Sequence, residues 1–187
     1  MYLSIGGADV SGLAKSISTS GTRSECARTL KAEIVQSPAD KNLPIVPISA
    51  GDQVAFGADG QSFVGVVTDI SRSTASSTVS VTAKDFGIYV KRNKITYKAK
   101  DTTPEAAAAE LCALYGMPAG SFAPTGYKYG RTFMGVSLYD AIMAGYSLAA
   151  QQTGKKYYLA MEGTAVCVWE RGQNIAAVIS EGRNLIE

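Results

Sequence analysis

The six residues from Thr153 to Tyr158, TGKKYY, place two lysines beside two tyrosines in a chain that otherwise spreads its charges thinly. Lysines next to aromatic rings can bind phosphates and stack bases. A Walker phosphate loop is excluded, because its first glycine would fall at Ala149 and its Ser or Thr at Lys156. The stretch follows a helical pattern, so we interpret Gly154 as a left-handed helix cap and the lysines as charges at a helix C-terminus.

Four aspartates could supply acid–base or metal chemistry. Asp52 and Asp59 would make an acid and a base, but both lie in turn sequences, GDQV and ADG, where aspartate bonds its own backbone. Asp85 and Asp101 could hold a cation between them, yet the sequence supplies no further oxygen ligands of the kind that calcium requires. We therefore assign no catalytic, metal-binding or cofactor-binding residue from the sequence.

Two other groups of side chains could bind larger ligands. Trp169 with Tyr157 and Tyr158 could form a platform for sugars, although alternation along a hairpin makes at least one of these rings part of the core. The run KRNKITYKAK, Lys91 to Lys100, could contact an acidic partner or a nucleic acid backbone. Its alternative is a solvated edge strand whose lysines oppose aggregation.

The composition excludes several classes of function. The chain has no histidine, which removes the commonest general base and metal ligand. Its net charge of +2 gives no strong attraction to nucleic acid or anionic membrane, and no apolar run approaches the roughly 20 residues that span a bilayer. We expect a protein made in a cytoplasm, without membrane insertion or sequence-specific nucleic acid binding. Cys26, Cys112 and Cys167 are predicted to be buried apolar residues.

The first 85 residues, roughly, are predicted to form strands. Apolar and polar residues alternate there with period two, and turn clusters separate the runs. We predict a small antiparallel barrel or sandwich, with a further strand over Val10 to Ser18 in which Gly12 marks a bulge. The residues predicted to share the alternating faces are Leu30, Ala32 and Ile34; Val64, Val66, Thr68 and Ile70; and Val79, Val81 and Ala83.

Beyond Lys84 the pattern becomes helical. DFGIYVKRN predicts a short helical turn and ITYKAK a strand. Thr103 and Pro104 begin a helix that stops at Gly116, with Ala107, Leu111 and Leu114 on one face. PAGSFAPTG is predicted to be a loop and YKYGRTFMG a strand.

A second helix begins at Ser137, with Asp140 in its first turn, and ends at Gly154. Its apolar stripe comprises Leu138, Ala141, Ile142 and Leu148. The residues from Tyr157 to Arg171 then predict a hairpin. The strand-like run AAVIS, Ala176 to Ser180, has no local partner, so we expect it to return to the N-terminal sheet.

Three runs then occur in one order along nearly the whole chain: DKNLPIVPISAGDQVAF, VSVTAKDFGIYVKRNKITYKAKDTTPEAAAAELCALYGMPAGSF and SLYDAIMAGYSLAAQQTGKKYYLAMEG. Each motif within them is a cap or a turn, and their ordered combination is the specific signal. Together they resemble the XkdQ-type tail hub proteins of contractile phages, defective prophages and phage-tail-like bacteriocins. That family is related to late control protein D and to the spike hubs of type VI secretion.

The predicted fold class is α+β, mainly β. We expect a tube-like antiparallel β-barrel over residues 1–93, closed by a return strand within residues 172–187. An inserted α+β subdomain with two helices and a β-hairpin occupies residues 94–171. The resemblance implies a structural protein without enzymatic activity: a baseplate hub that links the tail tube protein to the central spike and other baseplate proteins, in the tail of a virion or phage-like particle.

Two other classes of function stay open from the sequence. A carbohydrate- or peptidoglycan-binding module of a tail or cell-wall-associated protein would use the hairpin around Trp169. A carboxylate hydrolase would need two acids facing one cleft, roughly 5 to 10 Å apart.

The assembly state follows from the resemblance. Three copies of such a hub carry two tube-like barrels each, so every contact between neighbours joins a first barrel to a second. This chain stops at NLIE, about where the second barrel would begin. We predict a homotrimer for the full-length protein and a monomer for these 187 residues. Light scattering coupled to size exclusion measures this, and a stable trimer at micromolar concentration would contradict it.

Overall fold

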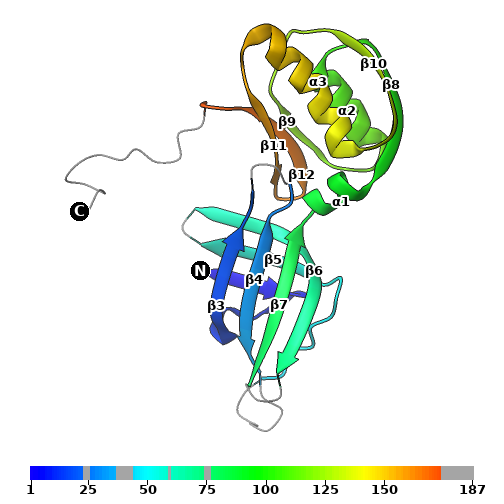
Figure 1. The fold of residues 1–187 in the computed structure, drawn as a ribbon. Helices are drawn as coiled ribbons and strands as arrows, with labels where there is room; N and C mark the ends of the chain where they lie inside the picture. Colours follow the sequence, from blue (N-terminus) through cyan, green and yellow to red (C-terminus); the bar gives the residue numbers. More distant parts are fainter. Residues whose placement is uncertain (23–25, 37–43, 59, 74–76, 174–187) are drawn as a thin grey trace, which may run out of the picture.

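The computed structural model describes residues 1–187 except 23–25, 37–43, 59, 74–76 and 174–187. It is mainly β with three α-helices, as the sequence predicted, and its apolar side chains form two separate cores. Figure 1 shows the larger sheet below, the longer helices above, and α1 between them. No described helix is long and apolar enough to cross a membrane.

The lower part contains seven strands and one 3-10 turn, and the upper part contains the helices and five strands. The elements of the lower part are β1 (Tyr2–Ile5), β2 (Ala8–Asp9), η1 (Ser11–Leu13), β3 (Ala14–Ser20), β4 (Thr29–Val35), β5 (Gln53–Ala58), β6 (Gln61–Ser73) and β7 (Thr78–Asp85). Those of the upper part are α1 (Gly87–Arg92), β8 (Lys94–Thr102), α2 (Pro104–Leu114), β9 (Ala119–Phe122), β10 (Tyr129–Ser137), α3 (Leu138–Thr153), β11 (Tyr157–Glu162) and β12 (Ala165–Glu170).

The seven strands of the lower part form one curled antiparallel sheet, a half-barrel, in the order β2-β1-β5-β6-β7-β4-β3. Its inner face carries the first core. The alternation predicted for β4 and β7 is confirmed, since Leu30 lies opposite Ala83 and Ala32 opposite Val81, all of them buried. Burial of these facing pairs removes apolar surface from water and holds the two strands in register.

The face predicted for β6 was wrong. Phe63 and Val67 are buried there, whereas Val64 and Val66 are only half-buried on the opposite side. The pairing with β7 shifts between Val67 and Asp69, and this irregularity changes the phase so that Ile70 packs against the core. An extra residue in a strand interrupts the alternation of its two faces. The buried face predicted from one end of β6 is therefore the wrong face at the other end.

The strand predicted over Val10 to Ser18 was wrong at its start. Ser11 to Leu13 form the 3-10 turn η1, and the strand β3 begins at Ala14. The carboxylate of Asp9 accepts a hydrogen bond from the Ser11 amide at 2.9 Å, which favours a turn over an extended chain. The irregular pairing of β3 lies between Ala14 and Ser16, not at Gly12.

The second core lies between α2, α3 and two small sheets, β10-β8 and β11-β12-β9. Both predicted helix starts are confirmed. The Thr103 hydroxyl accepts a hydrogen bond from the Ala106 amide at 3.4 Å, and the Ser137 hydroxyl accepts one from the Asp140 amide at 3.0 Å.

The loop predicted over PAGSFAPTG was wrong in part, because Ala119 to Phe122 form β9, which pairs in parallel with β12. The predicted helix faces also need correction. Leu114 is 63% exposed because it is the last residue of α2. Cys112 is buried instead, and on α3 the stripe is extended by the fully buried Tyr146.

The local structure predicted for the TGKKYY segment is confirmed. Gly154 has a φ of 71° and donates its amide to the Ala150 carbonyl at 2.9 Å, and Tyr157 begins β11. The ammonium of Lys155 contacts the carboxylate of Glu170 at 2.9 Å. Their hydrogen bond lowers the pKa of Glu170 and raises that of Lys155. The predicted return strand within residues 172–187 lies outside the described residues, apart from Gly172 and Gln173.

Gly154→Ala should lower the free energy of unfolding by about 1 kcal/mol, because a side chain disfavours the left-handed conformation of this cap. Gly12→Ala is the matched control, since Gly12 has no positive φ and open space around its Cβ position. Urea unfolding followed by circular dichroism measures both. Equal midpoints for the two variants would contradict the cap, whereas Lys155→Ala with Lys156→Ala should change stability little.

Candidate functional site at the junction of the two cores

The junction of the two cores is built around a buried carboxylate. Asp85 ends β7, and its side chain is fully buried. One carboxylate oxygen accepts a hydrogen bond from the Arg28 guanidinium at 3.0 Å, and the other accepts one from the Gly87 amide at 3.1 Å. The Asp85 amide in turn donates to the Arg28 carbonyl at 3.1 Å. Because a buried charge is costly unless it is paired, these bonds fix how β7 passes into α1.

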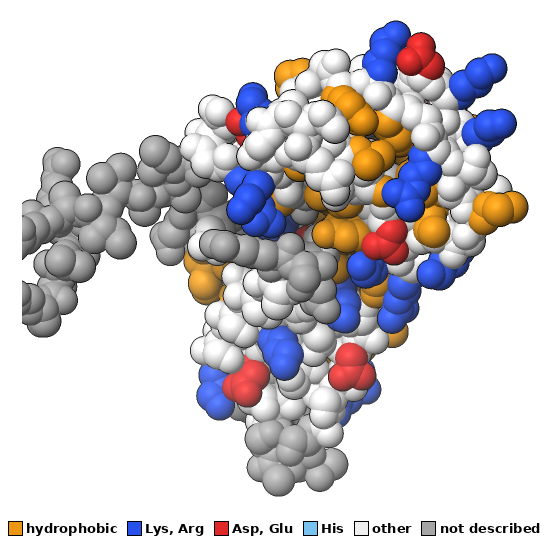
Figure 2. Space-filling model, turned by 45° about the horizontal axis from the view of Figure 1, so that its top comes forward, with side chains coloured by type: hydrophobic (Ala, Val, Ile, Leu, Met, Phe, Trp, Pro, Cys, Tyr) orange, Lys and Arg blue, Asp and Glu red, His pale blue; other side chains and the backbone are white. Residues whose placement is uncertain are grey.

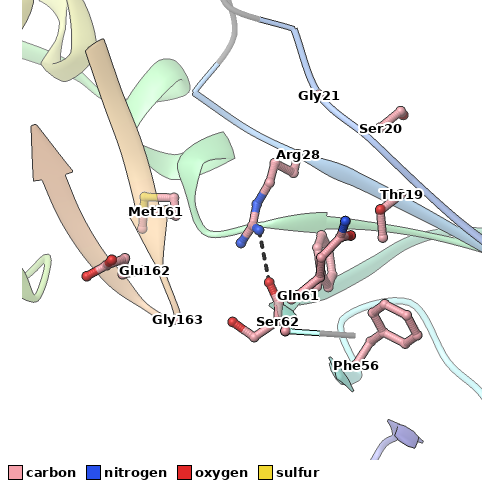
Figure 3. Close-up of a pocket in the computed structure, with 12 residues that line it drawn as sticks. Thr19, Ser20, Gly21, Arg28, Phe56, Gln61, Ser62, Met161, Glu162 and Gly163 are labelled. Atoms are coloured by element: carbon pink, nitrogen blue, oxygen red, sulfur yellow. Dashed lines mark hydrogen bonds between the residues drawn. The ribbon is translucent and has the colours of Figure 1, made fainter. Parts of the chain in front are cut away.

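Arg28 connects this carboxylate to the neighbouring strands. It precedes β4, and its guanidinium also donates to the Ser62 carbonyl of β6 at 2.9 Å (Figure 3). The guanidinium carbon lies 5.7 Å from the centre of the Phe63 ring. Arg28 therefore joins the start of β4, the start of β6 and the end of β7.

The backbone is packed closely on the other side of Asp85. Cys26 belongs to the second core although it precedes the half-barrel strand β4, and its thiol donates to the Gly87 carbonyl at 3.1 Å. A Cβ atom on Gly87 would lie 2.5 Å from the Cys26 carbonyl oxygen, so no larger residue fits without a backbone shift. The start of α1 is thus held against the segment before β4.

A cleft of about 530 Å³ lies beside this junction. Figure 3 shows Arg28 between the β11–β12 hairpin, with Met161 and Glu162, and the start of β6, with Gln61 and Ser62. The cleft lies between the half-barrel and the upper part. Its polar groups are mostly amide and hydroxyl groups.

The described residues that line the cleft include no cysteine. The Cys167 thiol lies 3.7 Å from the Glu162 carboxylate, but burial raises the pKa of this thiol and keeps it protonated near neutral pH. Burial likewise raises the pKa of Cys112 to about 11. All three cysteines are buried, as predicted. Arg28 is already engaged by Asp85 and Ser62.

The three candidate aspartates that the structure describes occupy separate environments. Asp52 accepts a hydrogen bond from the Ser49 amide at 2.8 Å in a turn, and Asp59 lies outside the described residues. Asp85 is buried at the junction, whereas Asp101 is exposed on β8 and lies 3.4 Å from Lys128. Within the described part of the chain, no group of three metal-ligating side chains could hold a metal ion.

The candidate sugar platform is reduced to two rings. Tyr157 is buried in the second core, with its ring centre 5.0 Å from that of Tyr146. Tyr158 and Trp169 lie opposite each other on β11 and β12, and both are half-buried on the other face of this sheet. The alternative of a glycan-binding module therefore rests on these two side chains.

The basic run from Lys91 to Lys100 forms the end of α1 and most of β8. Its lysines on β8 are exposed, and Ile95, Tyr97 and Ala99 alternate with them in the core. This arrangement fits both interpretations of the run, a contact surface and a protected edge.

Arg28 was not singled out from the sequence. Its partner Asp85 lies 57 residues away, and no local pattern connects the two. The sequence feature that could have indicated this pair is Asp85 itself. It is an acidic residue at the end of the alternating strand β7, and a carboxylate that is buried there needs a cation or amide donors.

The chain is similar to a family of known proteins and to two curated relatives. Residues 17–187 match the model of a family described as YQBQ-like. The chain is 28% identical over 148 residues to "Uncharacterized protein YqbQ" of Bacillus subtilis, covering 78% of this chain and 44% of that protein. It is 27% identical over 153 residues to "Phage-like element PBSX protein XkdQ" of the same organism, covering 80% of this chain and 46% of that protein. The chain thus spans less than half the length of these curated relatives.

Two solved structures share the fold. One is the 43 kDa tail protein of prophage MuSo2 from Shewanella oneidensis, with a TM-score of 0.65 and 18% identity over 89% of this chain and 53% of that one. The other is the tail protein from Neisseria meningitidis MC58, with a TM-score of 0.63 and 15% identity over 89% of this chain and 49% of that one.

Arg28→Met should lower the free energy of unfolding by about 3 kcal/mol, because it leaves the Asp85 carboxylate buried without its cation. Adding Asp85→Asn should recover part of this loss, since the buried group is then neutral. Lys15→Met is the control, because Lys15 and Glu33 form an exposed pair worth less than about 1 kcal/mol. Urea unfolding followed by circular dichroism and Trp169 fluorescence measures all three variants. An Arg28→Met midpoint equal to that of Lys15→Met would refute the role of the pair.

Proposed function

Because the chain belongs to the YQBQ-like family, we propose that it is a structural component of a phage or phage-like tail. The observation that carries this proposal is the fold, shared over 89% of the chain with a prophage tail protein from Shewanella oneidensis. The name of the relative XkdQ, a phage-like element protein, supports the same assignment.

Within the tail, we assign the chain to a baseplate hub that links the tail tube to the central spike. The partners in this proposal are the tail tube protein, the spike and other baseplate proteins. The chain covers 44% and 46% of its two curated relatives, so the hub would be a longer protein that contains this region. We propose that the full-length hub is a homotrimer.

The proposed domains are a tube-like barrel over residues 1–93, completed by a return strand within 172–187, and an inserted subdomain over residues 94–171. The separation of the apolar side chains into two cores supports this division. α1, the last element before this boundary, packs on the second core through Val90 and so joins the two domains.

The proposed role is structural and not enzymatic. Three of the polar groups considered for chemistry are occupied by contacts within the fold: Asp85 binds Arg28, Asp52 bonds a turn and Lys155 pairs with Glu170. Each of these bonds stabilises a junction, a turn or a helix end.

The test uses the full-length protein in the bacterium that encodes it. Immunogold electron microscopy of induced particles should place an epitope-tagged copy at one end of the tail. A strain without the gene should lack complete tails, and a plasmid copy should restore them. Label along the whole tube, or complete tails without the gene, would refute the hub role.

A further inference from the structure

Positive charge is concentrated on and beside one small sheet. Residues 91–102 and 128–137, which contain β8, β10 and the end of α1, hold seven of the 18 basic residues of the chain and one of its 16 acidic residues. Four of the seven, Lys94, Lys98, Lys100 and Arg131, lie on the two strands. The rest of the chain therefore carries more acidic than basic residues. Figure 2 shows Lys and Arg side chains along the upper right edge of the molecule, where Figure 1 places β8 and β10.

The lysines of β8 lie on the outer face of this sheet. Lys94, Lys98 and Lys100 are exposed there, on the side opposite the buried residues of the strand. Arg131 of the neighbouring strand β10 is also exposed, but it lies opposite Ala99, with its guanidinium 5.5 Å from the centre of the Phe133 ring, on the other side of the sheet. The lysines span roughly 20 Å at the usual rise of a strand.

β8 also has an open backbone edge. In the described part of the chain it pairs only with β10, so its second edge has no strand beside it. Such an edge presents unpaired amide and carbonyl groups, which another strand can complete.

The fold leaves most of these charges uncompensated. Lys128 pairs with Asp101 at 3.4 Å, and Lys91 pairs with Asp140 at 3.8 Å. Among the described residues, Lys94, Lys98, Lys100 and Arg131 have no ion pair. A second copy of β8 added at this edge would place lysines near lysines, which opposes self-pairing. An acidic strand would instead be attracted.

The aromatic side chains favour a protein over a nucleic acid as the partner. Tyr97, Tyr129 and Phe133 of these two strands are buried in the second core, so they offer no rings for base stacking. The outer face carries Met134, which is 76% exposed and lies opposite Thr96. A thioether and a threonine between lysines suit an apolar contact with a protein segment.

We propose that the open edge of β8 binds an extended acidic segment of a partner protein, which adds a strand to the β10-β8 sheet and places its carboxylates against Lys94, Lys98 and Lys100. This inference rests on the proposed function only in taking the partner to be another tail protein. The surface itself is defined by charge, exposure and an unpaired edge.

A synthetic peptide that alternates glutamate and valine tests the surface without reference to a tail. Fluorescence anisotropy with the 187-residue chain should show binding that weakens with salt. The triple change Lys94→Gln, Lys98→Gln and Lys100→Gln should raise Kd about tenfold, as expected for the loss of three exposed ion pairs. The control removes three exposed or half-exposed lysines elsewhere, Lys31→Gln, Lys84→Gln and Lys156→Gln, and should change Kd less than about twofold.

Strand addition is separated from simple charge attraction by the same peptide with every backbone nitrogen methylated. It keeps its carboxylates but cannot donate hydrogen bonds to the edge of β8, so its binding should fall at least about tenfold. Equal binding of the two peptides, or equal losses in both triple variants, would overturn the proposal. Tighter binding of a 20-base-pair DNA duplex, abolished by the β8 changes, would overturn it in favour of a nucleic acid surface. These outcomes are independent of where the full-length protein lies in a tail.

Discussion

The carboxylate of Asp85 is the constraint on which the arrangement of the two cores depends. It is fully buried, so it must be neutralised and hydrogen-bonded where it lies. Arg28 supplies the charge and Gly87 an amide, and these partners come from the segment before β4 and from the start of α1. Because Arg28 also binds the Ser62 carbonyl, one ion pair fixes three strands and the first helix of the second core relative to one another.

The parts of the structure that the sequence predicted are those set by near neighbours. Thr103, Ser137 and Gly154 cap their helices through contacts with residues three or four positions away, and such contacts can be read from spacing. The alternating buried faces of β4 and β7 were likewise predicted from residues that are neighbours in the sequence. A fold class follows from these patterns, because the elements have only a few ways to bury their apolar faces.

The parts that the sequence did not predict depend on distant residues. β9 is a strand only because β12 pairs with it, more than 40 positions further along the chain, and AGSF has no strand pattern of its own. The irregularity at Asp69 arises from the pairing of β6 with β7. The same limit applies to the candidate site, because the turn at Asp52 was predicted from its neighbours, whereas the pairing of Asp85 with Arg28 was not.

The half-barrel and the β10-β8 sheet protect their open edges differently, and this difference bears on how the molecule associates. The half-barrel ends in β2, which is only two residues long, and in β3, whose exposed residues are mostly serine and threonine. Lys15 on β3 is paired with Glu33 of the adjacent strand, so this edge carries little free charge.

β8 has the opposite character, because its three outward lysines have no ion pair among the described residues. A neutral polar edge discriminates between incoming strands mainly through shape and hydrogen bonds, whereas a charged edge rejects strands of like charge and attracts strands of opposite charge. Selectivity by charge is therefore greater at β8 than at the two described edges of the half-barrel.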